Sequence, residues 1–169
     1  EAAVAATNIG PCVVKAQVPA GKRGKVGGIK LARTPDEARA AADQILGMSI
    51  GGYTVERLLV EEQAQIVREF YAAALHDVVA RRALILFSTE GGMEIEEIAA
   101  AKPTAIRRLL LDIDGRLNAA DIAGMLKELD LGPSETQIVQ ILERLSTVYR
   151  KYDAELLEIN PLALLGDGR

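Results

Sequence analysis

A stretch rich in glycine and cations, residues 19–28 (PAGKRGKVGG), constrains the fold of this chain more than any other feature. Glycine, lysine and arginine are poor core residues, so the stretch is expected to form an exposed turn. The flanking segments, 12–18 (CVVKAQV) and 28–32 (GIKLA), are apolar and β-branched, which is typical of strands. The sequence therefore predicts a β-hairpin with a long, basic tip.

The glycine-rich tip matches neither of two common phosphate-binding motifs. Lys25 is followed by Val26, where a Walker A loop requires Ser or Thr. The glycines at 21, 24, 27 and 28 do not have the spacing of a dinucleotide-binding turn. Such a tip can still direct successive backbone N–H groups at an anion, with Lys22, Arg23, Lys25 and the nearby Lys15 adding charge. Two interpretations stay open here: a phosphate-binding loop and a solvated basic turn.

Composition and charge limit the classes of partner. The chain has 169 residues, of which 49% are apolar and 26% charged, as is typical of a globular protein. No apolar run approaches the ~18 residues of a membrane helix, and nothing resembles a signal peptide. Residues 2–35 carry six cations and no acid in a chain of net charge −4, which favours one localised anion over nucleic acid. Aromatic residues make up only 4%, so no base-stacking platform is expected.

The single cysteine, Cys12, and the single histidine, His76, exclude several kinds of site. They cannot form a disulfide within the chain or a zinc site of His and Cys ligands, and with one histidine no Ser-His-Asp or Cys-His catalytic arrangement is indicated. We expect Cys12 to be inert in a buried strand and His76 to be structural. One cysteine suits a reducing compartment, so a cytoplasmic location is expected.

Apolar periodicity predicts an α+β chain in two lobes. Residues 34–47 form a well-marked helix, with Thr34 as N-cap, Glu37 closing a capping box and Gly47 at the end. Further helices are expected at 94–100, 118–132 and 134–152, the last with a capping box of Ser134 and Gln137. Further strands are expected at 54–62, 68–78, 82–92 and 154–165, and residues 105–113 are compatible with a helix or a strand, of which the strand is favoured. Strict βαβ alternation is absent, and we place the boundary so that the lobes are 1–64 and 65–169.

Three segments carry side chains capable of chemistry. In 60–69 (VEEQAQIVRE), carboxylates follow a strand and either accept hydrogen bonds from sugar hydroxyls or are solvated. In 156–162 (LLEINPL), the period of a strand puts Glu158 and Asn160 on one face. They form either a pair of oxygen ligands for Mg²⁺ or the polar face of a strand. In 88–97 (STEGGMEIEE), a functional loop and an ordinary strand-to-helix connection are equally compatible with the residues.

Taken in order, VVKAQVPAGKRGKVGGIKLA, LLVEE, STEGGMEIEEIA and EINPL closely resemble the ATP-grasp region of the β subunit of succinyl-CoA synthetases, the ADP- or GDP-forming succinate–CoA ligases. The resemblance covers nearly the whole chain. It implies an ATP-grasp fold that holds ATP or GTP, with Mg²⁺, between two lobes. It also implies an enzyme that forms succinyl-CoA from succinate, CoA and nucleotide. Malate–CoA ligases and ATP-citrate lyases share this module and remain alternatives.

The resemblance also assigns roles to residues. Lys15 matches a lysine that contacts the phosphates, and Lys22, Arg23 and Gly24 match the loop over them. The positions that line the adenosine are matched by Glu61, Ala64 and Glu69. Asn160 matches one Mg²⁺ ligand. Glu158 matches a carboxylate that helps phosphoryl transfer to a histidine of the partner α subunit, which His76 does not match. A eukaryotic member would be expected in the mitochondrial matrix.

The chain departs from the family pattern at the hairpin tip. Pro19-Ala20-Gly21-Lys22 stands where His-Ala-Gly-Gly is usual, so Lys22 adds a cation where glycine is expected. An N-terminal segment, a second Mg²⁺ ligand and a C-terminal CoA-ligase domain are also missing from the match. We therefore expect a fragment that does not turn over alone. Alternatives of another class are a non-catalytic assembly module and a basic-loop RNA binder with a steep salt dependence.

Overall fold

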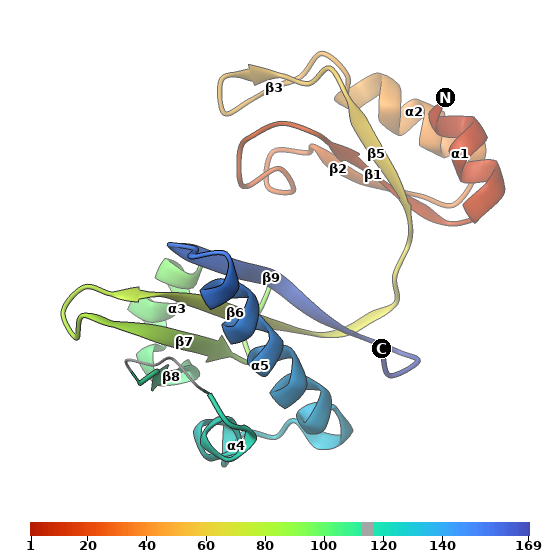
Figure 1. Ribbon diagram of the computed structural model, residues 1–169. Coiled ribbons are helices and arrows are strands. Elements are labelled where there is room, and N and C mark those ends of the chain that lie inside the picture. The colour runs from red at the N-terminus through yellow and green to blue at the C-terminus, as the bar shows by residue number, and fades with distance from the viewer. Residues whose placement is uncertain (113–116) are drawn as a thin grey trace. The chain divides into compact units, whose positions relative to one another are not determined.

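In the computed structural model, which describes residues 1–112 and 117–169, the predicted hairpin supplies two of the three strands of a small sheet. β1 (Cys12–Ala16) pairs antiparallel with β2 (Ile29–Ala32) on one side and with β5 (Leu58–Glu62) on the other. The helices α1 (Ala2–Ile9) and α2 (Pro35–Ile45) pack together on one face of this sheet (Figure 1). These elements belong to the first of two compact units, Glu1–Ala64.

Helix α2 begins where the sequence predicts. The Thr34 hydroxyl accepts a hydrogen bond from the Glu37 backbone N–H, which satisfies one free donor of the first turn. The Glu37 carboxylate accepts from the backbone N–H of Arg33 rather than from that of Thr34, so the capping box is displaced by one residue. The buried face of α2 packs on the alternate residues of β1, among them Cys12, which is fully buried. Burial raises the pKa of the Cys12 thiol, which keeps it in the unreactive form.

The segment between α2 and β5 differs from the expected single strand at 54–62. A two-residue hairpin, β3 (Ser49–Ile50) and β4 (Tyr53–Thr54), turns at Gly51 and Gly52, whose φ values are 60° and 84°. Only after this hairpin does β5 begin, at Leu58. Helix α1, for which no capping signal exists in the sequence, was not expected either, and no side chain caps its start.

The second unit, Gln65–Arg169, contains a four-stranded antiparallel sheet with strand order β8-β7-β6-β9. The strands are β6 (Ile66–Asp77), β7 (Arg82–Ser88), β8 (Ile106–Leu110) and β9 (Leu156–Leu165). Helix α3 (Ile95–Ala101) lies on one face of the sheet, and α4 (Ala119–Leu126) and α5 (Glu135–Lys151) lie on the other (Figure 1). Short 3₁₀ turns, Pro103–Ala105 and Gly132–Ser134, precede β8 and α5.

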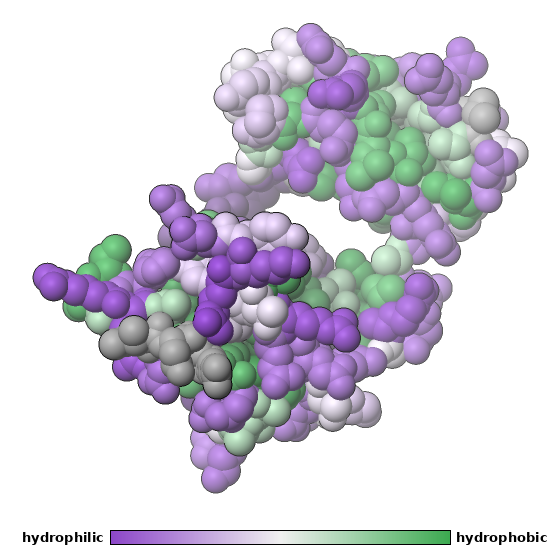
Figure 2. Space-filling view, in the orientation of Figure 1, coloured by the Kyte–Doolittle hydropathy of each residue, from purple (hydrophilic) through white to green (hydrophobic). Residues whose placement is uncertain are grey.

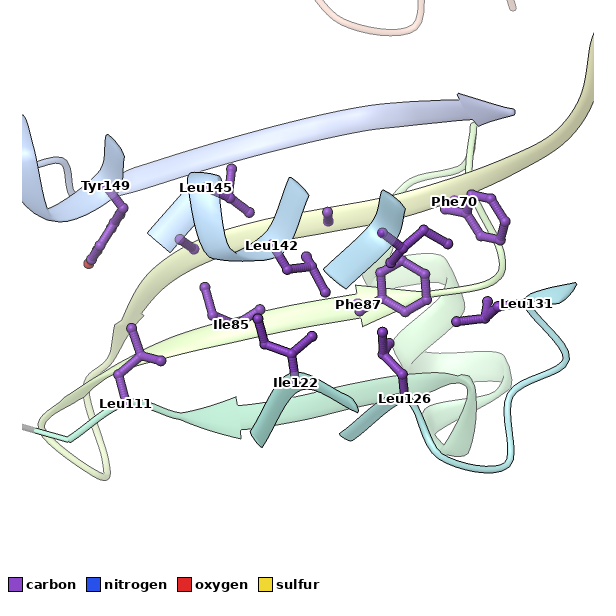
Figure 3. Packing of buried hydrophobic residues seen from close by; sticks show 13 residues of the cluster. Phe70, Ile85, Phe87, Leu111, Ile122, Leu126, Leu131, Leu142, Leu145 and Tyr149 are labelled. Carbon is purple, nitrogen blue, oxygen red and sulfur yellow. The ribbon is translucent and has the colours of Figure 1, made fainter. Parts of the chain in front are cut away.

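The core of the second unit fills the space between the sheet and α4 and α5 (Figure 3). Phe70 of β6 and Phe87 of β7 stack there with ring centroids 5.7 Å apart, and Leu142 of α5 is fully buried. Because strand side chains alternate, Leu157 and Ile159 of β9 pack against this core. Glu158 and Asn160 of β9 therefore belong to the opposite face, where α3 lies.

Several local expectations in the second unit need correction. The predicted capping box of α5 is wrong, since the Ser134 hydroxyl donates to the Leu131 carbonyl at 2.5 Å instead of capping the helix. Helix α4 ends at Leu126 rather than near 132, and Glu128 beyond it has a φ of 73°. The strand expected at 105–113 is observed as Ile106–Leu110, and Ile113 lies outside the described residues. His76 hydrogen-bonds the Tyr149 hydroxyl at the edge of the core.

The turn between β6 and β7 is built by Asp77. Its carboxylate accepts hydrogen bonds from the backbone N–H groups of Val79 and Ala80, at 3.0 and 2.9 Å. The turn leaves Val78 and Val79 84% and 90% exposed, and hydrophobic atoms are visible at this tip, at the left of Figure 2. Among the described residues, no helix is both long and apolar enough to cross a membrane.

Candidate functional site

Lys15 lies near the end of β1, on the face of the first sheet that the helices leave open. Its cross-strand neighbours are Ile29 of β2 and Leu59 of β5. On the same face, Val13 lies opposite Leu31, which is 64% exposed. The open face thus presents a cation surrounded by apolar side chains, a surface suited to a flat ring next to a negative charge.

One carboxylate balances this cation. The Lys15 ammonium forms an ion pair of 2.5 Å with the Glu61 carboxylate, and the two side chains are 33% and 44% exposed. An ion pair this accessible to water adds little to stability, so Lys15 can exchange its partner for a bound anion at small cost. Ala64, the last residue of this unit, is exposed and follows β5 by two residues.

The basic tip of the hairpin is folded on itself. Three of its backbone N–H groups, those of Lys25, Gly27 and Gly28, donate to carbonyls within the tip. The Arg23 guanidinium donates to the Ala16 carbonyl at 2.9 Å, which ties the tip to the end of β1. A Cβ at Gly28 would lie 2.6 Å from the end of the Ile50 side chain and 3.0 Å from the Arg23 carbonyl oxygen, so a larger residue would displace these neighbours. These three N–H groups are thus engaged within the tip. An anion would be attracted mainly by the positive side chains of the tip.

Within the tip, Lys22 and Gly24 are exposed. Lys22 has a φ of 60°, a backbone region that favours glycine. Lys22 stands where the family resemblance predicts glycine, and glycine would adopt this backbone conformation without strain.

In the second unit, Asn160 of β9 is held at both ends of its side-chain amide. Its Oδ1 accepts a hydrogen bond of 3.1 Å from the Gly92 N–H, and its Nδ2 donates to the Met93 carbonyl at 3.0 Å. The segment STEGG therefore has at least one definite role, which is to orient Asn160. Sequence reasoning had left the role of this segment undecided.

The two glycines of STEGG are needed because the segment lies against β6. The Gly91 N–H donates to the Glu69 carbonyl at 3.1 Å, and a Cβ on Gly91 would lie 2.5 Å from the backbone nitrogen of Phe70. A Cβ on Gly92 would collide with the Glu69 carboxylate. Glu69 in turn lines an open hollow of about 500 Å³, formed by residues 66–69 and 89–91.

Glu158 is exposed and lies two residues from Asn160, on the same face of β9. The register of β6 against β9 places Tyr71 of β6 on the same face beside it, and the Glu158 carboxylate is one of the groups that raise the pKa of the Tyr71 phenol. Sequence reasoning missed Tyr71, because an aromatic residue in an apolar strand is most often a core residue. Only the register of β6 against β9 reveals that it neighbours Glu158.

The oxygen donors of β9 fit a hard divalent cation. A carbonyl oxygen has two lone pairs, so Asn160 Oδ1 retains acceptor capacity after bonding Gly92, and the Glu158 carboxylate is accessible. Magnesium accepts one or two such protein oxygens together with phosphate oxygens and water. The described part of the chain contains no group of three His, Cys, Asp or Glu side chains that would form a complete metal cage. A cation here would have to complete its coordination with other oxygens.

The chain belongs to the ATP-grasp domain family, which matches residues 1–164. The α+β ATP-grasp fold predicted from the sequence is thereby confirmed. Within this family, the chain is similar to β subunits of succinate–CoA ligases, as its motifs had indicated.

Three curated relatives illustrate this similarity. The ADP-forming subunit β of Rubrobacter xylanophilus is 46% identical over 99% of this chain and 44% of the relative. The ADP-forming subunit β of Chloroflexus aurantiacus is 45% identical over 98% and 44%. The GDP-forming subunit β of Thermus thermophilus is 42% identical over 92% and 41%. The chain thus spans less than half the length of these relatives.

Solved structures share the fold at lower identity. An acetyl-coenzyme A synthetase of Ca. Korarchaeum cryptofilum aligns with a TM-score of 0.74 and 22% identity, over 96% of this chain and 74% of that one. The ATP citrate lyase of Methanothrix soehngenii aligns with a TM-score of 0.69 and 24% identity, over 94% and 36%. At these identities the likeness concerns the fold alone.

Proposed function

We propose that this chain is the nucleotide-binding part of the β subunit of an ADP- or GDP-forming succinate–CoA ligase. The whole enzyme would form succinyl-CoA from succinate, CoA and ATP or GTP, through a phosphohistidine on an α subunit. The choice of acid is supported by the names of the relatives that match almost all of this chain. Because those relatives are more than twice as long, the chain alone is not expected to complete the reaction.

The observation that carries the proposal is the position of Lys15 on an open, apolar sheet face. A nucleotide offers a flat base and a chain of negative phosphates. Ile29 and Leu59 beside Lys15 would contact the base, and Lys15 would leave Glu61 for a phosphate oxygen. Lys22 and Arg23 in the tip would add positive charge near the phosphates, with Gly24 giving room for close approach.

The polar residues that follow would contact the sugar and the metal. Glu61, Ala64 and Glu69 are proposed to line the adenosine, the carboxylates accepting hydrogen bonds from ribose hydroxyls. Asn160 would hold Mg²⁺, since its amide is fixed by Gly92 and Met93 with acceptor capacity left. When bound, Mg²⁺ neutralises charge on the phosphates.

Glu158 is the proposed catalytic residue. Its exposed carboxylate would accept a hydrogen bond from the histidine that receives the phosphoryl group, and so hold that ring in line for attack. Positioning and charge neutralisation, rather than covalent chemistry by this chain, are what phosphoryl transfer requires. The proposed location of the enzyme is the cytoplasm.

Two alternative functions remain: an enzyme of the same kind that acts on another carboxylic acid, and a module without catalytic activity. A malate–CoA ligase or an ATP-citrate lyase would use the same module, and the fold shared with ATP citrate lyase is compatible with this. A non-catalytic assembly module would keep the fold without binding nucleotide.

The test uses the full-length β subunit assembled with its partner. Adding ATP or GTP with Mg²⁺ should raise the melting temperature, and Lys15→Ala should abolish the shift. Lys30→Ala is a matched control, because Lys30 pairs with the buried Val14 and so lies on the opposite face of the same sheet. It should keep the full shift.

Steady-state assays with succinate, malate and citrate then identify the acid. Absence of any nucleotide-dependent shift in the assembled parent protein would favour the assembly module. If Lys15→Ala and Lys30→Ala reduce the shift in melting temperature equally, the nucleotide does not bind to the proposed face of the sheet.

A further inference from the structure

Tyr71 is a buried tyrosine on the same sheet face as the proposed catalytic carboxylate. It is 3% exposed, while its neighbours Phe70 and Ala72 point into the core on the other face. Ala73 of β6 lies directly opposite Glu158 of β9, and the register shifts between Phe70 and Ala72, where β9 carries Asn160. Tyr71 thus occupies the position on β6 beside both functional residues of β9, where its phenol can reach the Glu158 carboxylate.

In a hydrogen bond between these two groups the phenol is the donor, because an ionised carboxylate only accepts. Burial is the main cause that raises the pKa of Tyr71, and the Glu158 carboxylate and the charge of Glu96 on α3 raise this pKa further. The hydroxyl therefore stays protonated throughout the physiological range. An O–H group that donates to a carboxylate makes a charge-assisted bond, which is stronger and more directional than a neutral one.

The two partners differ in mobility. Tyr71 is fixed in the sheet by its strand neighbours, with the fully buried Ser88 of β7 directly opposite. Glu158 is exposed, and a free glutamate side chain samples many rotamers, which costs entropy whenever one of them is required. A bond from a fixed donor to a mobile carboxylate restricts the mobile partner.

We propose that Tyr71 is a positioning residue for Glu158. Its phenol donates a hydrogen bond to the Glu158 carboxylate and holds it in the orientation in which it contacts the histidine that accepts the phosphoryl group. This inference rests on the proposed function, because it concerns the same site. Tyr71 touches neither nucleotide nor metal in this scheme and acts only through Glu158. Its loss should therefore slow the chemical step without weakening nucleotide binding.

The first experiment replaces Tyr71 by Phe in the full-length β subunit assembled with its partner. Tyr71→Phe removes one hydroxyl and keeps the buried ring. We expect kcat to fall about tenfold while the KM for nucleotide changes less than about twofold, as for an interaction used only in the transition state. Tyr149→Phe is the matched control: Tyr149 is also 3% exposed, and its hydroxyl bonds His76 on the other side of the sheet. It should leave kcat within about twofold.

The second experiment is a double-mutant cycle with Glu158→Gln. If Tyr71 acts through Glu158, adding Tyr71→Phe to Glu158→Gln should cause no further loss, because interacting residues are not additive. Single-turnover phosphorylation of the partner subunit by labelled ATP keeps slow variants measurable. Melting temperatures of all variants exclude general unfolding as the cause.

Two results would overturn the positioning role: an unchanged kcat in Tyr71→Phe, or an equal loss from Tyr71→Phe with and without Glu158→Gln. Either result requires that the parent enzyme is active, so neither would contradict the proposed function. An assembled parent protein that binds no nucleotide and never phosphorylates its partner would contradict the proposed function, and the role of Tyr71 with it.

Discussion

Lys22 carries two opposing effects at the level of a single residue. Its φ of 60° lies in the left-handed region, which costs a residue with a side chain about 1 kcal/mol relative to glycine. The same residue exposes an ammonium group on the tip that we propose to contact phosphates. The sequence thus accepts a strained backbone at a position where charge serves the proposed function.

Replacing Lys22 by Gly should separate these effects. We expect Lys22→Gly to raise the free energy of unfolding by about 0.5 kcal/mol, since relief of strain is partly offset by the greater entropy of glycine in the unfolded chain. The same variant should weaken nucleotide binding several-fold because a cation is lost. Chemical denaturation measures the first effect, and titration calorimetry on the assembled protein measures the second.

Lys22→Ala provides the control for that prediction, because it removes the charge without relieving the strained backbone. It should weaken nucleotide binding as much as Lys22→Gly does, without the gain in stability. Unchanged affinity in both variants would mean that the Lys22 ammonium does not contact the nucleotide.

At the scale of elements, the sequence predicts well those strands and helices that have a regular apolar pattern. The stripe of α2 and the alternation at the start of β9 follow from burial of one face, whereas β6 and β7 are identified by continuous apolar runs that are buried on both faces. The sequence-based predictions are wrong where a turn or a helix start depends on a few local contacts. The β3–β4 hairpin depends on two glycines with positive φ, and Ser134 satisfies Leu131 instead of capping α5.

The candidate site shows the same division. Glu158 and Asn160 share a face because alternate residues of a strand point to the same side, and this can be predicted from their spacing in the sequence. The proximity of Tyr71 to Glu158 and the hydrogen bond between Gly92 and Asn160 join residues 87 and 68 positions apart, and no local pattern encodes such pairs. Their prediction requires the register of β6 and β9, which only the folded sheet supplies.

The loop between β7 and α3 offers a prediction at this scale. Gly91→Ala would bring a Cβ to 2.5 Å from the Phe70 backbone, so the loop must move away from β6 and release Asn160. We expect a loss of about 2 kcal/mol in the free energy of unfolding, as for other overpacked sites. The variant should also bind Mg²⁺-nucleotide more weakly.

A second glycine in the same unit is the control for this substitution. Gly124 lies inside α4, and a Cβ there would meet nothing within 4 Å. Gly124→Ala should therefore stabilise the protein, by up to about 1 kcal/mol, through its better helix propensity. Denaturation curves of the two variants should shift in opposite directions. A stable Gly91→Ala variant would show that the loop tolerates displacement from β6.

At the scale of the whole molecule, each of the two units has its own sheet and its own buried cluster. The cluster of residues 1–64 lies between β1 and the helices α1 and α2, and that of residues 65–169 lies between its sheet and α4 and α5. The two clusters have no residue in common. A unit with a separate core can unfold as a separate cooperative segment.

Core truncations should therefore act within one unit. Leu142→Ala removes a fully buried side chain from the second core, and we expect a loss of about 3 kcal/mol there. Hydrogen exchange read by mass spectrometry should show reduced protection in peptides from 65–169, with those from 1–64 unchanged. Val14→Ala, at a fully buried position of the first core, should give the reverse pattern. If both variants instead lower protection across the entire chain, the two cores unfold together, and changes at either one would reach the proposed nucleotide and metal residues alike.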